Sequence, residues 1–129
     1  MHLGDLRHAI QGHVTEPHLL HVYMDAIDEL HKSFALAYSG AFEALETTEV
    51  FVFLFRVSEE YFRLLQDRTQ ESLAIFAYFC PITKRLESNW WCKGFSSHLM
   101  SEIYVLLDEE HRLWIQWAIE ETGSLPRGV

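Results

Sequence analysis

Hydrophobic residues recur at steps of three and four positions over most of this chain, which is the spacing of one face of an α-helix. The clearest case begins at Pro17, because proline suits the first turn of a helix. Its apolar positions are Leu19, Tyr23, Ala26, Leu30, Phe34 and Ala37. Polar side chains occupy the opposite face, and Gly40 can end the segment. The pattern therefore predicts a long amphipathic helix from Pro17 to near Gly40.

The hydrophobic pattern is less clear on both sides of this helix. Residues 1–15 are mostly polar and contain Gly4 and Gly12, so we expect a loosely ordered N-terminal segment before a helical domain over residues 16–129. The next segment ends in the run VFVFLF, which has the composition of a buried strand. Because the sequence holds no second strand-like run to pair with it, we interpret residues 41–55 as helical.

Two polar residues mark the starts of the following helices. Ser58 precedes two glutamates, whose negative charges suit the N-terminal end of a helix. Thr69 precedes a segment over residues 70–86 that is apolar nearly all round, which predicts a central, buried helix. Pro81 lies inside this segment and should kink it, because proline lacks a backbone N–H group.

The C-terminal part of the chain predicts two further helices. The first covers about residues 91–107 and has apolar residues on one stripe. Asp108 can cap the second, which Gly123 can end. At 129 residues the chain has the size of a single domain. The sequence therefore predicts one compact all-α domain of five to seven helices.

Composition and charge exclude several classes of function. Nineteen acidic residues against ten basic ones give a net charge of −9, and no basic cluster interrupts this balance. Direct binding to nucleic acid or to an anionic membrane surface needs such a cluster, so we expect neither. We also expect no signal peptide and no membrane span, because the longest apolar run, Val50 to Phe55, is far too short. These features predict an intracellular protein of the cytoplasm or the nucleus.

Three stretches of the sequence resemble the C-terminal regulatory domain of fungal zinc-cluster transcription factors of the sterol-uptake-regulator type. They are AIDELHKSFALAYS at 26–39, RVSEEYFRLLQDRTQESLAIFAYFCPITKRLESNWW at 56–91 and LMSEIYVLLDEEHRLWIQW at 99–117. The resemblance covers roughly residues 20–123. It is a pattern of core residues and contains no catalytic motif, so it is specific for the fold and weak for chemistry.

The resemblance implies a helical domain that responds to a signal and, as in the sterol regulators, binds a sterol in an apolar pocket. The six-cysteine zinc cluster with which these factors bind DNA is missing, since the chain has only Cys80 and Cys92. Both cysteines lie in apolar helical patterns, which favours free thiols over a disulfide. The chain has Trp117-Ala118 where the family tends to have Trp-Pro, which implies a pocket of different shape.

A set of aromatic residues is the candidate ligand-binding site. Large aromatic side chains with few polar neighbours suit a lipophilic ligand, although the same residues can simply fill a core. Four tryptophans are more than packing needs in a domain of this size. The candidates are Phe76, Phe79, Trp90, Trp91, Phe95, Tyr104, Trp114 and Trp117.

Polar residues near these aromatics are the candidates for acid–base chemistry. His98 and Glu102 are four positions apart on one predicted helix and can share a site with Asp108 or His111, or they can form an ordinary surface pair. Glu87 precedes the tryptophan pair and is a further candidate. The candidate catalytic residues are therefore His98, Glu102, Glu87 and Asp108.

The histidines also raise the question of a metal ion. His18, His21 and Asp25 share one helical face, but the tighter H-E-x-x-H spacing of helical zinc sites is absent. The sequence contains no phosphate-binding loop and no nucleophile elbow. We therefore expect neither a metal nor a cofactor.

The leading hypothesis is a stand-alone, transcription-factor-derived domain that binds a lipophilic small molecule, such as a sterol or terpenoid, in a regulatory or sensing role. The alternative is an enzyme of fungal secondary metabolism, a cyclase or isomerase that uses the same pocket with acid–base groups. A domain detached from a larger protein also exposes apolar surface, which predicts a homodimer or a protein partner.

Overall fold

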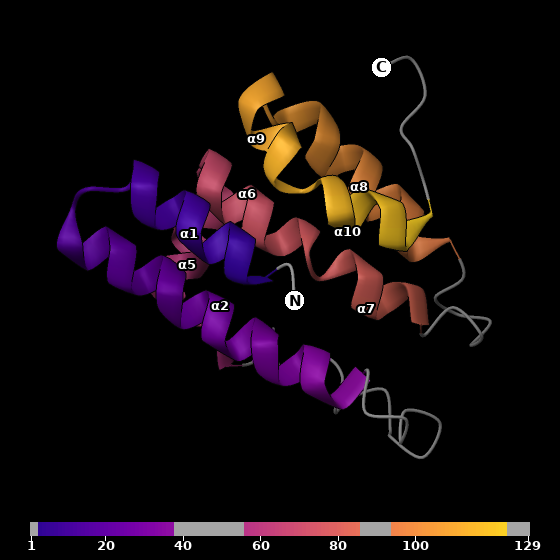
Figure 1. Ribbon diagram of the computed structural model, residues 1–129, viewed down its shortest axis with the longest axis horizontal. Coiled ribbons are helices and arrows are strands. Elements are labelled where there is room, and N and C mark those ends of the chain that lie inside the picture. The colour runs from indigo at the N-terminus through magenta and orange to yellow at the C-terminus, as the bar shows by residue number, and fades with distance from the viewer. Residues whose placement is uncertain (1–2, 38–55, 86–93, 124–129) are drawn as a thin grey trace.

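The computed structural model describes residues 3–37, 56–85 and 94–123 (Figure 1). These three ranges contain helices and no strand, so the predicted all-α class is confirmed. The helices are α1 (Leu3–His13), α2 (Pro17–Ala37), α5 (Glu59–Gln66), α6 (Gln70–Ala77), α7 (Cys80–Arg85), α8 (Phe95–Leu106), α9 (Glu109–Trp114) and α10 (Gln116–Thr122). The helical interpretation of residues 41–55 lies outside the described residues.

The predicted helix boundaries agree with the structure where a capping side chain marks them. Ser58, Thr69 and Asp108 each accept a hydrogen bond from the backbone N–H three residues further on, which begins α5, α6 and α9. Gly123 ends α10 in the left-handed conformation, with φ of 72°. Pro17 is the first residue of α2, as predicted.

The N-terminal segment differs from the expectation of loose order. Residues 3–13 form α1, and its apolar residues Leu3, Leu6 and Ile10 are all buried. They recur at steps of three and four and so make one narrow stripe, which packs against α2 and α9. Three apolar residues are a weak sequence signal, and the tertiary contacts of this stripe are what hold the helix.

The central segment is divided in two, and it is not one helix kinked at Pro81. Helix α6 ends at Ala77, whose carbonyl cannot receive the usual helical hydrogen bond because Pro81 has no N–H group. Tyr78 and Phe79 donate instead to carbonyls three residues back, at 3.1 and 2.9 Å. Pro81 then lies in the first turn of α7, where no backbone donor is needed.

The last predicted helix is also divided. Helix α9 ends at Trp114, and Ile115 separates it from α10 with φ of −106° and ψ of 15°. With the break between α6 and α7, this gives eight helical segments in the described ranges. None of these helices is long and apolar enough to cross a membrane.

The predicted central position of residues 70–86 is confirmed for the part that the structure describes. Helices α6 and α7 lie between α2 on one side and α8 to α10 on the other (Figure 1). The side chains of Ile75 and Ile82 are fully buried there. Helix α1 covers one end of this arrangement, packing against both α2 and α9. This placement brings the N-terminal helix beside the aromatic residues of α9 and α10.

Candidate binding site

Three aromatic side chains from two separate parts of the chain meet at one surface groove of about 330 Å³. Tyr78 comes from the break between α6 and α7, Trp114 from the end of α9 and Trp117 from α10. Helix α1 forms the opposite wall. The described residues that line it are Asp5, Ala9, Tyr78, Leu113, Trp114, Gln116 and Trp117.

Trp117 connects this groove to the hydrophobic core. Its ring centroid lies 5.8 Å from that of Phe34 on α2 and 5.9 Å from that of Tyr78, with the Tyr78 ring inclined by 24°. Offset aromatic pairs at such distances are stabilising beyond the area that they bury. The groove therefore has a floor that is held by the packing of α2, α6 and α10.

Trp114 contacts two histidine rings. The centroid of the His13 ring is 4.8 Å from that of Trp114, with an interplanar angle of 69°. The His111 ring lies at 4.4 Å on the same α9 helix, with an angle of 60°. These contacts fix the orientation of a tryptophan that also faces the groove.

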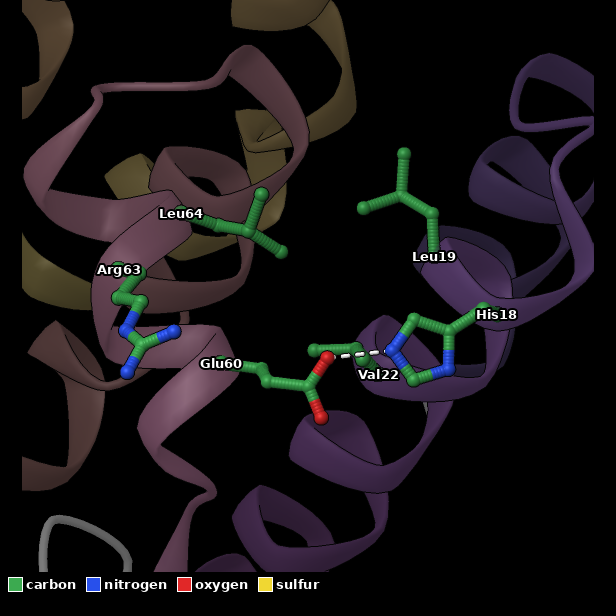
Figure 2. Close-up of a pocket in the computed structure, with 6 residues that line it drawn as sticks. All are labelled: His18, Leu19, Val22, Glu60, Arg63 and Leu64. Carbon is green, nitrogen blue, oxygen red and sulfur yellow. Dashed lines mark hydrogen bonds and ion pairs between the residues drawn. The ribbon is translucent and has the colours of Figure 1, made fainter.

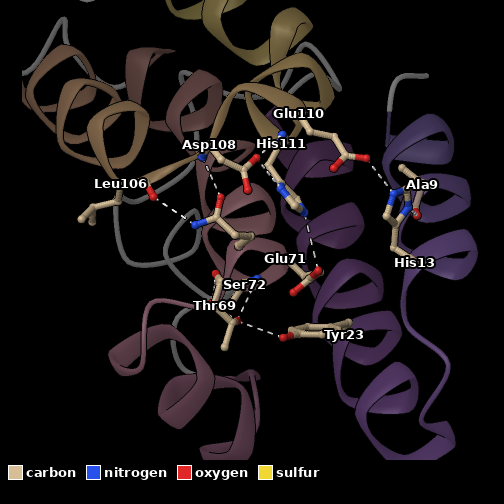
Figure 3. Close-up of polar contacts among 11 residues, drawn as sticks. Ala9, His13, Tyr23, Thr69, Glu71, Ser72, Leu106, Asp108, Glu110 and His111 are labelled. Carbon is tan, nitrogen blue, oxygen red and sulfur yellow. Dashed lines mark hydrogen bonds and ion pairs between the residues drawn. The ribbon is translucent and has the colours of Figure 1, made fainter.

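Both histidines belong to a polar network beside the groove (Figure 3). His13 bonds through Nε2 to Glu110 Oε1 at 3.0 Å and through Nδ1 to the Ala9 carbonyl at 2.9 Å. His111 bonds through Nδ1 to Asp108 Oδ1 at 2.7 Å. Its Nε2 is buried without a hydrogen bond, 3.6 Å from the Glu71 carboxylate. The network joins α1, α6 and α9.

Two pKa values are shifted within this network. The hydrogen bonds to the Ala9 carbonyl and to Glu110 raise the pKa of His13 above its ordinary value of 6.5. Hydrogen bonds from the backbone N–H and the ring of His111 lower the pKa of Asp108 below its ordinary value. The first shift favours the positive charge of His13 on α1, and the second favours the negative charge of Asp108 at the start of α9.

The three candidate acid–base residues that the structure describes, His98, Glu102 and Asp108, do not line the groove. His98 and Glu102 form a loose pair at 3.9 Å on α8, with side chains 76% and 66% exposed. Asp108 caps α9 and bonds to His111. Glu87 lies outside the described residues. The described part of this set therefore does not favour acid–base chemistry in the groove.

Three other predicted aromatic residues, Phe76, Phe79 and Tyr104, are described and do not line the groove. The rings of Phe76 and Phe79 stack on each other, with centroids 6.0 Å apart and an angle of 6°. The guanidinium group of Arg112 packs over the ring of Tyr104, with its central carbon 4.2 Å from the ring centroid. Trp90, Trp91 and the side chain of Phe95 fall outside what the structure describes. Of the predicted set, Trp114 and Trp117 form part of the groove.

A second, smaller groove of about 200 Å³ lies between α2 and α5 (Figure 2). Its lining is His18, Leu19, Val22, Glu60, Arg63 and Leu64. His18 Nε2 bonds to the Glu60 carboxylate at its edge, which raises the pKa of this histidine. Across the described ranges, no group of three or more His, Cys, Asp or Glu side chains is arranged to hold a metal ion.

The sequence-based candidates omitted one wall of the larger groove. Asp5 and Ala9 on α1, and the neighbouring His13, were missed because residues 1–15 were expected to be loosely ordered. The spacing of the buried Leu3, Leu6 and Ile10 is the signal that predicts this helix. Comparison of the chain with models of known families, with curated proteins and with solved structures finds no match.

Proposed function

We propose that this protein binds a lipophilic small molecule with a compact ring system in the groove between α1 and α9–α10. The observation that carries the proposal is the convergence of Tyr78 with Trp114 and Trp117, from which it is distant in sequence, on one groove. Rigid aromatic side chains offer a flat, weakly hydrated surface, which suits an apolar ring. A sterol or terpenoid belongs to this chemical class.

The groove's dimensions narrow the class of ligand. Its volume of about 330 Å³ is at the lower end of small-molecule sites, which span roughly 300–1,000 Å³. A terpenoid, or one end of a sterol, suits it better than a long flexible chain. The exposed Gln116 amide at its edge can donate and accept hydrogen bonds, so it can orient a ligand hydroxyl.

The proposed role is regulatory or sensing. It is supported by the resemblance of residues 20–123 to the regulatory domain of sterol-uptake regulators, and by the lack of an acid–base pair among the groove residues that the structure describes. The net charge of −9 does not suit direct contact with nucleic acid. The bound molecule would therefore act through a protein partner or through a second copy of the chain.

The test uses the neutral fluorescent probe N-phenyl-1-naphthylamine, whose emission rises in an apolar site. We expect saturable binding, and displacement of the probe by farnesol or ergosterol. Leu113 lines the groove with 72% of its surface exposed, so Leu113→Ser should leave the fold intact. Losing this apolar contact should weaken probe binding about tenfold.

The matched control is Val105→Ser. Val105 on α8 is 71% exposed but does not line the groove. The probe should bind this variant as tightly as the unchanged protein. Equal weakening in both variants, or no saturable binding to the unchanged protein, would contradict the proposal.

A further inference from the structure

One stripe of α1 forms both a wall of the groove and its link to α9. Asp5, Ala9 and His13 follow each other at steps of four, which places them on the same side of the helix. The first two line the groove, and His13 reaches Glu110 at the beginning of α9. The bond between His13 and Glu110 therefore joins the α1 wall directly to α9.

The bonds of His13 require a particular protonation state. The carbonyl of Ala9 and the carboxylate of Glu110 are both hydrogen-bond acceptors. A neutral imidazole carries one N–H group, so it can donate to only one of them, whereas the imidazolium ion donates to both. The geometry thus matches the charged ring, and the raised pKa of His13 agrees with it.

His13 also lies beside a groove residue. Its ring is 4.8 Å from the Trp114 ring in a T-shaped arrangement, with an angle of 69°. Protonation of His13 therefore strengthens the contact with α9 through Glu110, next to a side chain that lines the groove.

We propose that protonation of His13 draws α1 against α9 and so strengthens ligand binding in the groove. The inference rests on the proposed function, because it concerns regulation of the same site. Linkage makes the effect reciprocal. A ligand that binds more tightly when α1 is held against α9 must also favour the protonated form of His13. Binding should then be tighter in mildly acidic than in alkaline solution.

The carboxylates around His13 favour its positive charge. From α9, Glu110 and the ring of His111 face His13, and from α6 the Glu71 carboxylate favours its charge. The contact between α1 and α2 carries a separate ion pair, Arg7 with Asp28 at 2.8 Å.

The experiment measures the dissociation constant of N-phenyl-1-naphthylamine at about pH 6 and about pH 9, between which histidine loses its proton. We expect the probe to bind at least roughly fivefold more weakly at the higher pH, the lower end of common coupling strengths. His13→Gln keeps a donor for Glu110 but does not titrate, so its affinity should be the same at both values.

His18→Gln is the matched control. It also removes a histidine that bonds to a glutamate on another helix, but in the smaller groove between α2 and α5. This variant should keep the full pH dependence of probe binding. NMR titration of the His13 ring should give a midpoint above 6.5, the ordinary histidine value, that rises further when the probe is added and falls in Glu110→Gln.

The outcomes separate the two proposals. Probe binding that is equal at both pH values, or whose pH dependence persists in His13→Gln, overturns the inference and leaves the proposed function standing. A protein that binds no probe at either pH overturns the proposed function and this inference with it.

Discussion

The hydroxyl group of Tyr78 donates a hydrogen bond of 2.9 Å to the backbone carbonyl of Trp114. Trp114 is the last residue of α9, so its carbonyl has no partner within that helix. Tyr78 lies at the break between α6 and α7. This bond therefore attaches the end of α9 to the centre of the molecule, and it does so at the wall of the groove.

Removing this hydroxyl should destabilise the protein. We expect Tyr78→Phe to lower the free energy of unfolding by about 1 kcal/mol, since a partly buried carbonyl loses its donor. The melting temperature should fall by about 4 °C in a domain of this size. Burial raises the pKa of Tyr78, so the hydroxyl stays a donor and the effect should not change between mildly acidic and mildly alkaline solution.

Tyr104→Phe is the control for this variant. The Tyr104 hydroxyl makes no hydrogen bond with the described residues, and the contact of its ring with Arg112 survives the change. Chemical denaturation of the two variants should therefore separate them. Equal midpoints would show that the bond from Tyr78 does not stabilise the end of α9.

The packing of α1 can be tested at Ile10, which is fully buried. Ile10→Ala should cost about 2–5 kcal/mol, the range for truncating a large aliphatic side chain in a core. Urea denaturation measures this cost, and limited proteolysis should show earlier cleavage before α2. Gln11→Ala changes the exposed neighbour on the same helix and should stay within about 0.5 kcal/mol of the unchanged protein. Similar stability of the two variants would mean that α1 is not part of the core.

Two glycines should respond to alanine in opposite directions. Gly12 lies within α1, and an added Cβ there meets no atom within 4 Å. Gly12→Ala should therefore stabilise the protein by about 0.5–1 kcal/mol, because alanine loses less backbone freedom on folding. Gly123 ends α10 with φ of 72°, and Gly123→Ala should cost about 1 kcal/mol or more in that conformation. Thermal melts of the two variants that shift in the same direction would contradict this assignment.

His18 should make stability depend on pH. Its bond to Glu60 raises its pKa in the folded protein above 6.5, its ordinary value. A group with a raised folded pKa contributes stability that is fully present below the unfolded value and is lost as pH rises through the folded value. The contribution of this bond to the free energy of unfolding should therefore fall as the pH rises above about 6.5 and through the raised pKa of the folded protein.

The fall in the free energy of unfolding should be smaller in His18→Gln. It should be smaller again in the double variant with His13→Gln, because the pKa of His13 is also raised in the folded protein. Urea denaturation at several pH values measures the slope. An unchanged slope in both variants would show that neither histidine gains its proton preferentially in the folded state.

The helix boundaries that the sequence predicted correctly depend on local chemistry. Ser58, Thr69 and Asp108 each accept a hydrogen bond from a backbone N–H only three residues away. Their effect can therefore be predicted from the local sequence, without the rest of the fold. The apolar segment that contains Ile75 and Ile82 was predicted to be central for a similar reason, because a helix without a polar face has to be buried.

The predictions that failed depended on distant partners. The order of α1 depends on the contacts of Ile10 and its neighbours with α2 and α9, which no pattern within eleven residues reveals. Of the aromatic residues that the sequence singled out, Trp114 and Trp117 reach the groove, whereas Phe79 and Tyr104 pack elsewhere. All four are aromatic residues in apolar helical patterns, so the sequence could not show which of them reach the groove.

The sequence by itself determined the all-α class, the capped starts of α5, α6 and α9, and the central position of α6, because periodicity and capping act over one or two helical turns. Only the tertiary structure decided that α1 faces α9, that His13 meets Glu110 across 97 positions of sequence, and that Tyr78 joins Trp114 and Trp117 in one groove. These relationships are set by how the buried faces of several helices fill a common core, and no single segment carries that information.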